Sequence, residues 1–386
     1  MAKLGDIATI QSGGTPARSI AEYWEDGTIP WVKISDIKSK HLNQTEEMIT
    51  EAGLENSSAK IFPKGTILYT IFATLGETSI LDINAATNQA IAGISITDSR
   101  VLPDYLYYYL LSQKIHVQKI GRGVAQNNIN MKLLRDFDVP LPSKEAQLNI
   151  IEQLNRVTEL LFLRKQQLTK LDELIKARFV EMFGDMLLNS LEWPEKPLEG
   201  LADIVSGITK GRKTTETGLI EVPYMAVSNV KSGYIDWTTI KTILATKQEI
   251  EQYRLMPDDI LMTEGGDPDK VGRGAIIKNP LENSIHQNHI FRVRLYESEL
   301  LPAYFAEYLQ HQKAKRYFLG CAKQTTGIAS INMRQLRALP VVIPPLPLQN
   351  QFAAFVAEVD KSKVEVQKAL DQTQLLFDSL MQQYFG

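Results

Sequence analysis

Several short patterns in this sequence come close to catalytic motifs, and each lacks a residue that its chemistry requires. An adenine methyltransferase loop needs Asn, Asp or Ser before Pro-Pro and an aromatic residue after it, but Ile343-Pro344-Pro345-Leu346 has neither. A phosphate-binding P-loop has Gly and Lys-Ser/Thr at fixed spacing, and residues 207–214 have them in the wrong order. A metal-dependent nuclease would need Lys where Gly266 stands, after Asp258 and Glu264. We therefore expect no catalytic centre in this chain.

Metal binding and thiol chemistry have equally little support in the sequence. His286 and His289 form an H-x-x-H pair without a third ligand. Asp267 and Asp269 would bind Ca²⁺ only with further oxygen ligands, which the sequence does not offer nearby. Cys321 is the only cysteine, and a lone cysteine is more often a small buried apolar side chain than a nucleophile. We expect this chain to bind no metal and no cofactor of its own.

Polar and basic side chains in loops remain, and these suit contacts with DNA. Arg and Lys pair with guanine, amides pair with adenine, and cations contact phosphates. The segment 206–214 is a basic loop with a counterpart at 11–18, and the polar segment 123–130 has a counterpart at 324–332. The alternative for any one of these residues is ordinary turn chemistry.

The candidate DNA contacts follow from these segments and from the polar ends of the strands next to them. In the first half of the chain they are Thr15, Arg18, Lys33, Ser35, Asp36, Thr70, Thr74, Arg122, Gln126, Asn127, Asn128 and Lys132. In the second half they are Lys210, Arg212, Lys213, Asn229, Lys231, Thr263, Lys270, Arg273, His286, Gln287, Asn288, Lys323, Gln324 and Arg334. Asn130 and Asn332 have helix capping as their alternative role.

The charge balance excludes a general polyanion binder. The 386 residues carry a net charge of -3. Residues 1–143 have 13 Lys and Arg against 15 Asp and Glu, and residues 198–342 have 18 against 16. No segment is strongly basic, so contact with nucleic acid has to come from local patches, and partner proteins would add to its strength.

The elements that position these residues occur twice. Leu4-Gly5-Asp6-Ile7 returns as Leu201-Ala202-Asp203-Ile204, and Ile129-Asn130-Met131-Lys132 returns as Ile331-Asn332-Met333-Arg334. Other matched segments lie between them in the same order, and each half closes on a proline cluster followed by a long helical stretch. Conserved order over such lengths indicates a tandem duplication of one unit, a globular domain followed by a long helix.

Each globular domain mixes strands and helices. Short runs rich in β-branched residues, such as 66–71 and 289–294, are separated by Gly, Pro and Asp. The segments 103–119 and 302–318 begin with Pro and have apolar residues at helical spacing, which predicts one helix in each. We assign the fold class α+β and expect a curved antiparallel sheet with a few helices in each domain.

Two long helices follow the proline clusters. A heptad seam with alternating spacings of four and three runs through both, interrupted only by Arg164 and Arg178 in the first helix and by Lys363 and Thr373 in the second. The seam includes Leu154, Leu161, Leu168 and Ile175 in the first helix and Val359, Val366, Leu370 and Phe377 in the second. The simplest arrangement is an antiparallel coiled coil, a rod of about 50 Å for roughly 35 residues. The alternative is that both helices serve only as core packing.

These patterns predict four segments. They are a first domain over residues 1–142, a first helical spacer over 143–184, a second domain with a leading linker over 185–347, and a second helical spacer over 348–386.

The ordered set of motifs resembles the specificity subunits of type I restriction-modification enzymes. The resemblance rests on Leu4-Gly5-Asp6-Ile7 with Gly13-Gly14-Thr15-Pro16, the Ile29-Pro30-Trp31 strand, the repeated Ile-Asn-Met segment and the Pro-Leu-Pro that leads into each helix. It covers essentially the whole chain. It implies two target-recognition domains, each reading one half of a split double-stranded DNA sequence, and a helical spacer that fixes the distance between the halves.

The resemblance also implies partners. Two methyltransferase subunits that carry S-adenosylmethionine would dock on this chain, together with restriction and translocase subunits that use ATP and Mg²⁺. No run of about 18 apolar residues and no signal peptide occur, so we expect a cytoplasmic location. The alternatives are the specificity subunit of a methyltransferase-only or other multi-subunit modification system and, from another class, a coiled-coil scaffold that binds only proteins.

Overall fold

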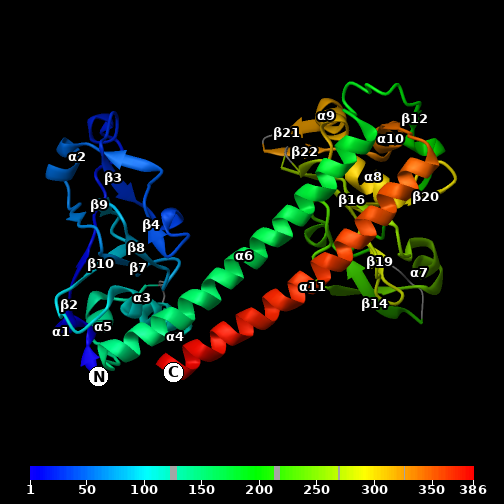
Figure 1. Cartoon of the computed structure of the whole chain (residues 1–386). Coiled ribbons are helices and arrows are strands. Elements are labelled where there is room, and N and C mark those ends of the chain that lie inside the picture. Colours follow the sequence, from blue (N-terminus) through cyan, green and yellow to red (C-terminus); the bar gives the residue numbers. More distant parts are fainter. Residues whose placement is uncertain (122–127, 213–217, 268–269, 326) are drawn as a thin grey trace. The chain divides into compact units, whose positions relative to one another are not determined.

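The computed structural model describes residues 1–121, 128–212, 218–267, 270–325 and 327–386. The chain forms two compact units (Figure 1). Unit 1 consists of residues 1–165 and 368–386, and unit 2 consists of residues 166–367. Each unit therefore contains one globular domain and half of each long helix, whereas the sequence division at 143 and 348 separates the helices from the domains.

The main sheet of unit 1 has the strand order β2-β10-β7-β8-β4. All its pairs are antiparallel except β4 with β8, and Ile94 lies opposite both Ile10 and Ile67. A second sheet has the order β5-β3-β9-β6, in which β3 and β9 are parallel. The strands are β1 (Ala2–Lys3), β2 (Ala8–Ser12), β3 (Ile29–Val32), β4 (His41–Leu42), β5 (Glu47–Ile49), β6 (Ile61–Phe62), β7 (Ile67–Thr70), β8 (Thr78–Leu81), β9 (Ala85–Thr87), β10 (Ile91–Ile96) and β11 (Asp138–Val139).

Unit 2 repeats this topology. Its main sheet has the order β13-β20-β16-β18, and in a second sheet β14 pairs with β19 in parallel, as β3 pairs with β9. A small third sheet has the order β17-β22-β21. The strands are β12 (Glu195–Pro197), β13 (Ala202–Ser206), β14 (Ile220–Met225), β15 (Lys241–Ala245), β16 (Ile260–Thr263), β17 (Gly265–Gly266), β18 (Gly274–Ile276), β19 (Ile285–His286), β20 (Ile290–Leu295), β21 (Lys323–Thr325), β22 (Ile328–Ser330) and β23 (Pro340–Val342).

The duplication and the α+β class are confirmed, but each domain holds several small sheets with parallel pairs instead of one antiparallel sheet. The single helix predicted over 103–119 is also wrong, because it breaks into α3 (Pro103–Ser112) and α4 (Lys114–Gly121). The one predicted over 302–318 breaks into α8 (Pro302–Tyr308) and α9 (Gln312–Cys321), since His311 adopts an extended backbone and caps α9. The remaining short helices are α1 (Leu4–Ile7), α2 (Glu51–Glu55), α5 (Met131–Arg135), α7 (Lys247–Tyr253) and α10 (Met333–Arg337).

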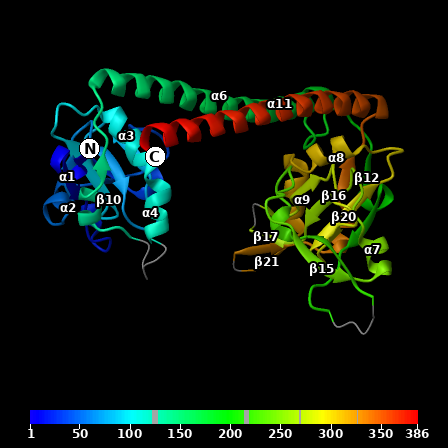
Figure 2. The ribbon, with the colours of Figure 1, turned by 90° about the horizontal axis from the view of Figure 1, so that it is seen from below.

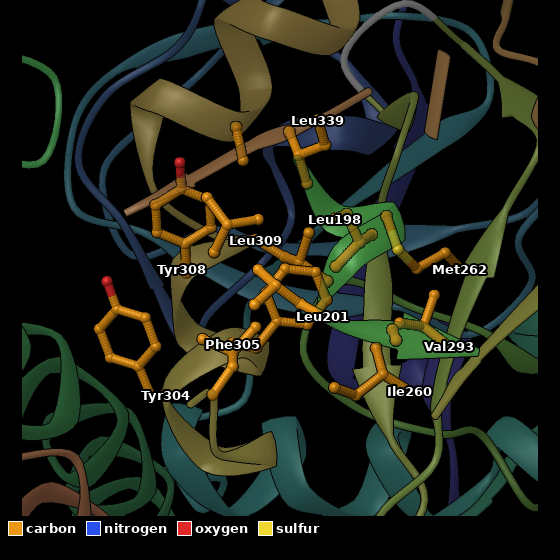
Figure 3. Packing of buried hydrophobic residues seen from close by; sticks show 14 of the residues in the cluster. Leu198, Leu201, Ile260, Met262, Val293, Tyr304, Phe305, Tyr308, Leu309 and Leu339 are labelled. Carbon is orange, nitrogen blue, oxygen red and sulfur yellow. The ribbon is translucent and has the colours of Figure 1, made fainter. Parts of the chain in front are cut away.

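The core of unit 2 places α8 between the main sheet and the long helices. Tyr304, Phe305 and Tyr308 of α8 are fully buried. They lie beside Leu198, Leu201, Ile260, Met262, Val293, Leu309 and Leu339 (Figure 3). The Tyr304 ring stacks on Phe179, with 5.3 Å between ring centroids. Each such side chain contributes about 1.5–3 kcal/mol when removed from water, so the helices are part of this core. Figure 2 shows α8 beneath the helical pair.

The two long helices are α6 (Lys144–Phe183) and α11 (Leu346–Phe385). Ser143 caps the start of α6 by accepting a hydrogen bond from the Ala146 amide at 3.2 Å. Gly184 follows its end with φ of +73°, a left-handed conformation that glycine adopts without steric cost. No residue of the predicted seam is exposed in either helix, so the heptad prediction is confirmed.

Within each unit the two helices run antiparallel. In unit 1, Gln153 near the start of α6 accepts a hydrogen bond from Tyr384 near the end of α11. In unit 2, Asp172 of α6 pairs with Lys363 of α11 at 2.6 Å. The polar residues that interrupt the seam therefore make contacts between the helices. Arg164 is a further example, because its guanidinium donates to the backbone carbonyl of Ala369.

Candidate nucleic-acid interface

In unit 1, an arginine makes cation–π contacts with two tryptophans whose rings are nearly perpendicular to each other. The Arg18 guanidinium carbon is 3.7 Å from the ring centroid of Trp24 and 4.9 Å from that of Trp31. Trp31 is buried and donates to the Gly14 carbonyl at 3.0 Å. A Cβ on Gly14 would lie 2.3 Å from Ser58 backbone, so only glycine fits there. The close-packed glycine turn and the cation–π contacts hold Arg18 in position with about half of its side chain exposed.

Acidic residues surround the basic side chains next to Arg18. Glu47 pairs with Arg18 at 2.5 Å and with Lys33 at 3.0 Å, and Glu46 pairs with Lys33 at 2.8 Å. The hydrogen bonds that the Lys33 ammonium donates to Glu46 and Glu47 hold the pKa of Lys33 above its usual range. The same bonds lower the pKa of both carboxyl groups, for Glu47 chiefly through Arg18. DNA contact through Lys33 would thus have to compete with two carboxylates.

Four of the predicted DNA contacts are buried, and for these the prediction is wrong. Thr70 donates to the Thr74 carbonyl and accepts from the Glu77 amide at 2.8 Å. His286 lies between the carbonyls of Tyr253 and Val205. The four buried side chains are Thr70, Asn229, Thr263 and His286. Groups without exposed surface stabilise the fold and do not contact DNA in this conformation.

Asp36 and Asn229 are equivalent residues of the two units, and both cap a short 3-10 turn. Asp36 accepts from the Lys33 amide at 2.9 Å, and Asn229 accepts from the Ala226 amide at the same distance. Both residues therefore have a role in local structure, and the half-buried Asp36 has one carboxylate oxygen engaged in it. Asn130 and Asn332 cap α5 and α10, so capping, the alternative, is their observed role.

Arg212 is also a structural residue. Its Nε donates to Glu249 at 2.6 Å, and a second nitrogen completes a bidentate pair with the same carboxylate. Glu249 also accepts a hydrogen bond from the Thr246 amide at the start of α7. The hydrogen bond from Arg212 is the main reason why the pKa of Glu249 is lowered. The pair is mostly buried. Phosphate contact through Arg212 would therefore have to compete with Glu249.

Seven predicted side chains are exposed and make no ion pair or side-chain hydrogen bond in the part of the chain that the structure describes. Ser35 and Thr74 belong to loops of unit 1, and Asn128 forms an isolated bridge with Phe72. Within the described residues, the four cations of this group have no ion-pair partner. The full group is Ser35, Thr74, Asn128, Lys132, Lys210, Lys323 and Arg334. Unpaired, exposed cations are the groups that contact phosphates most readily.

The remaining predictions are partly engaged or lie outside the described residues. Lys231 pairs with Asp236, and Lys270 pairs with Asp267. Gln287 accepts from the Val227 amide, and Thr15 donates to Gln89. Half-buried Arg273 and Asn288 also belong to this set. Arg122, Gln126, Asn127 and Lys213, and the side chain of Gln324, fall outside the part of the chain that the structure describes.

An open hollow in unit 2 was not predicted as a binding site from the sequence. Its volume is about 350 Å³, and it is lined by Val227, Glu264, Gly265, His289 and Ser330. His289 Nδ1 lies 2.6 Å from a Glu264 carboxylate oxygen. The two residues are 25 positions apart in the chain, and the pairing of β16 with β20 brings them together. Among the described residues, no group of three or more potential ligands could hold a metal ion.

Comparison with known proteins gives one consistent family. A family model described as the type I restriction modification DNA specificity domain matches twice, over residues 1–173 and 190–373. The specificity subunit of the type I restriction enzyme MjaIX from Methanocaldococcus jannaschii is 24% identical over 98% of this chain and 90% of its own length. The EcoKI specificity subunit from Escherichia coli is 20% identical over 100% of this chain and 88% of its own length.

Solved structures show the same fold. The S subunit of a type I restriction-modification system from M. genitalium aligns with a TM-score of 0.53 at 17% identity, covering 98% of this chain and 94% of that one. A chain from a study of complex assembly and conformational transition of the type I R-M system aligns with a TM-score of 0.58 at 16% identity, covering 100% and 96%. No helix among the described residues is long and apolar enough to cross a membrane.

Proposed function

The chain belongs to the type I restriction-modification DNA specificity family, and from this premise we propose that it selects the DNA sequence on which a multi-subunit modification enzyme acts. The observation that carries the proposal is the duplication. The family model matches each half of the chain separately, and the two halves share strand order and parallel pairs. A duplicated reading domain suits a target made of two separated half-sequences.

Each unit would read one half-sequence through its exposed loops. Cations without ion-pair partners among the described residues are available for phosphates in both units, with Lys132 in unit 1 and Lys210, Lys323 and Arg334 in unit 2. Phosphate contacts set position, and contacts with base edges set sequence preference. The net charge of -3 is too low for tight binding by charge alone. Strong DNA binding would therefore depend on partner subunits.

The helices would set the spacing of the two half-sequences. α6 and α11 each run through both units, and they pair antiparallel in each. An antiparallel coiled coil has a length fixed by the number of its heptads. The contacts of Arg164 with Ala369 and of Lys363 with Asp172 fix the register of the two helices.

The helices also carry apolar side chains that face away from the seam. On the unit 1 halves of α6 and α11, the exposed apolar residues include Leu160, Phe162, Leu163, Leu375 and Leu376, with Leu375 69% exposed. Exposed apolar groups of this kind mark protein contacts. We propose that two methyltransferase subunits, which bring S-adenosylmethionine, dock on the helices. Restriction and translocase subunits would supply the ATP- and Mg²⁺-dependent chemistry, and this chain would be non-catalytic.

The protein-only scaffold is not favoured, because the family match covers the globular domains as well as the helices. The direct test is to express the chain with the methyltransferase subunit of its own system and to sequence the methylated DNA. We expect methylation at one split motif with a constant gap, and none from either subunit alone. Methylation without sequence preference, or from this chain alone, would overturn the proposal.

A further inference from the structure

Equivalent positions of the two units differ in chemistry at the hollow of unit 2. The Glu264 amide donates to the His289 carbonyl, just as the Ile71 amide donates to the Ala90 carbonyl in unit 1. The Glu264 carbonyl accepts from Ile331, as the Ile71 carbonyl accepts from Ile129. Glu264 and His289 thus stand where unit 1 has two buried apolar residues, Ile71 and Ala90. A polar pair that replaces an apolar one is not required by the shared fold.

The next position also differs. Gly265 bridges to Ser330 at the place where Phe72 bridges to Asn128 in unit 1. Phe72 is a large side chain and is 46% exposed in unit 1, whereas Gly265 has no side chain and lines the hollow of unit 2. Glu264 lines the same hollow, and about a third of its carboxylate side chain is exposed.

The hydrogen bonds of His289 leave part of that carboxylate unused. Asn288 Nδ2 lies 3.3 Å from His289 Nε2, and His289 Nδ1 lies 2.6 Å from Glu264 Oε2. Since an amide NH₂ only donates, Nε2 accepts and Nδ1–H donates to the carboxylate. Within the described residues, Glu264 Oε1 has no hydrogen-bond partner. The imidazole thus positions the carboxylate and leaves one oxygen free to accept.

A cation lies close to the hollow on the same small sheet. Ser330 is paired on one side with Gly265 and on the other with Lys323. Lys323 is exposed and has no ion-pair partner among the described residues. A phosphate contact at Lys323 would bring a base edge toward the hollow. A carboxylate next to a phosphate contact is unfavourable unless it accepts a hydrogen bond from the DNA.

We infer that Glu264, positioned by His289, reads an exocyclic amino group in the major groove, either N6 of adenine or N4 of cytosine, within the half-sequence of unit 2. This inference rests on the proposed function. Both amino groups are donors that a carboxylate accepts well, and thymine and guanine present only acceptors at the corresponding place. The equivalent position of unit 1 cannot make this contact, because the side chain of Ile71 has no hydrogen-bond acceptor. The two halves of the target are therefore read by different chemistry at this position.

The test uses the complex of this chain with its methyltransferase subunits. Motifs methylated by the wild-type protein, Glu264→Ala and Glu264→Gln are compared, with Glu282→Ala as the control because Glu282 is an exposed acid of the same unit. We expect Glu264→Ala to lose preference at one base position of one half-sequence, by roughly five- to 150-fold, the equivalent of about 1–3 kcal/mol. Glu282→Ala should keep every preference. An unchanged motif with Glu264→Ala would overturn the inference.

Glu264→Gln distinguishes the two bases. Its amide pairs with adenine through both N6 and N7, so adenine preference is kept, whereas cytosine preference is relaxed.

A second measurement keeps the inference testable if Glu264→Ala fails to fold. It uses DNA duplexes in which the critical base lacks its amino group. The wild-type complex should bind these duplexes about tenfold or more weakly than the intact duplex. The loss of affinity should be different for the complex that contains Glu264→Gln. Equal penalties for both proteins at every base would contradict the inference. Absence of any sequence preference in the wild type would instead contradict the proposed function.

Discussion

Gln147 and Gln349 occupy the same position in the two units and make the same three hydrogen bonds. Each amide oxygen accepts from the backbone N–H of the leucine before a helix, Leu102 at 3.0 Å and Leu301 at 2.9 Å. Each amide nitrogen donates to two carbonyls, one before that leucine and one in the proline cluster. Both side chains are fully buried. They join the start of each long helix to the globular domain.

Replacing either glutamine should destabilise its own unit. Gln349→Ala leaves the Leu301 amide and two carbonyls without partners in the interior, and each unsatisfied group costs about 1–3 kcal/mol. Because water fills part of the space, we expect a loss of roughly 2–4 kcal/mol. Urea unfolding measures it, with Asn350→Ala as the control, since Asn350 is exposed. The interpretation is contradicted if the two variants are equally stable.

His286 should make unit 2 sensitive to acid. Burial lowers its pKa from 6.5 to about 4, so the unfolded state takes up a proton at a higher pH than the folded state does. Stability is therefore complete above about pH 6.5 and falls as the pH decreases toward 4, by at most roughly 3 kcal/mol. Urea unfolding from pH 7 to 4 should show this component in the wild type and lose it in His286→Gln. The control is His41→Gln, at an exposed histidine of unit 1, which should retain this pH-dependent component. If His286→Gln has the same pH dependence of stability as the wild type, His286 is not the group responsible.

Lys210 and Lys323 should contact phosphates, whereas Arg212 should not. Each Lys→Ala change should weaken binding of all sequences alike and reduce the slope of log K against log salt by about one. Arg212→Ala should instead lower stability, because it leaves Glu249 without its bidentate partner. Fluorescence anisotropy of the assembled complex at several salt concentrations measures the slopes. A slope reduced by Arg212→Ala in a protein of unchanged stability would contradict this assignment.

The length of the paired helices should set the gap in the recognised sequence. Removal of residues 164–170 and 364–370 takes one heptad from each helix at matched levels, as the contacts of Arg164 with Ala369 and of Asp172 with Lys363 indicate. The pair shortens by about 10 Å, or roughly three base pairs, and the seam stays continuous. We expect a shorter gap with both half-sequences kept, and weaker binding because the helical phase of the half-sites also changes. As a control, matched deletions of a length other than seven residues should disrupt the pairing of the helices. If the heptad-deleted protein folds and the gap in its recognised sequence is unchanged, the helices do not set the spacing.

The sequence alone predicted the features that depend on local pattern. Heptad spacing located α6 and α11, the repeated motifs located the duplicated domains, and Asn130 and Asn332 were recognisable as alternative caps. The features that it did not predict depend on residues far apart in the chain. Arg212 meets Glu249 across 37 positions, and His289 meets Glu264 across 25.

Burial was also hard to read from residue type. Gln147 and Gln349 lie near the starts of amphipathic helices, where glutamine is ordinarily exposed. Their burial depends on the proline cluster and on the start of α3 and α8, which only the tertiary structure brings together. The sequence analysis placed polar strand residues such as Thr70 and His286 on the surface for the same reason. The type of a polar residue does not show whether backbone carbonyls surround its side chain in the folded protein.

The most direct test of the two-unit account is to replace residues 1–142 by the corresponding domain of a relative with a different target and to sequence the methylated DNA of the host. Because each unit has its own core and its own exposed loops, we predict that one half of the split motif changes to that of the relative. The other half and its dependence on Glu264 should remain as in the wild type. A change of both halves together, or of neither in an active complex, would contradict the account.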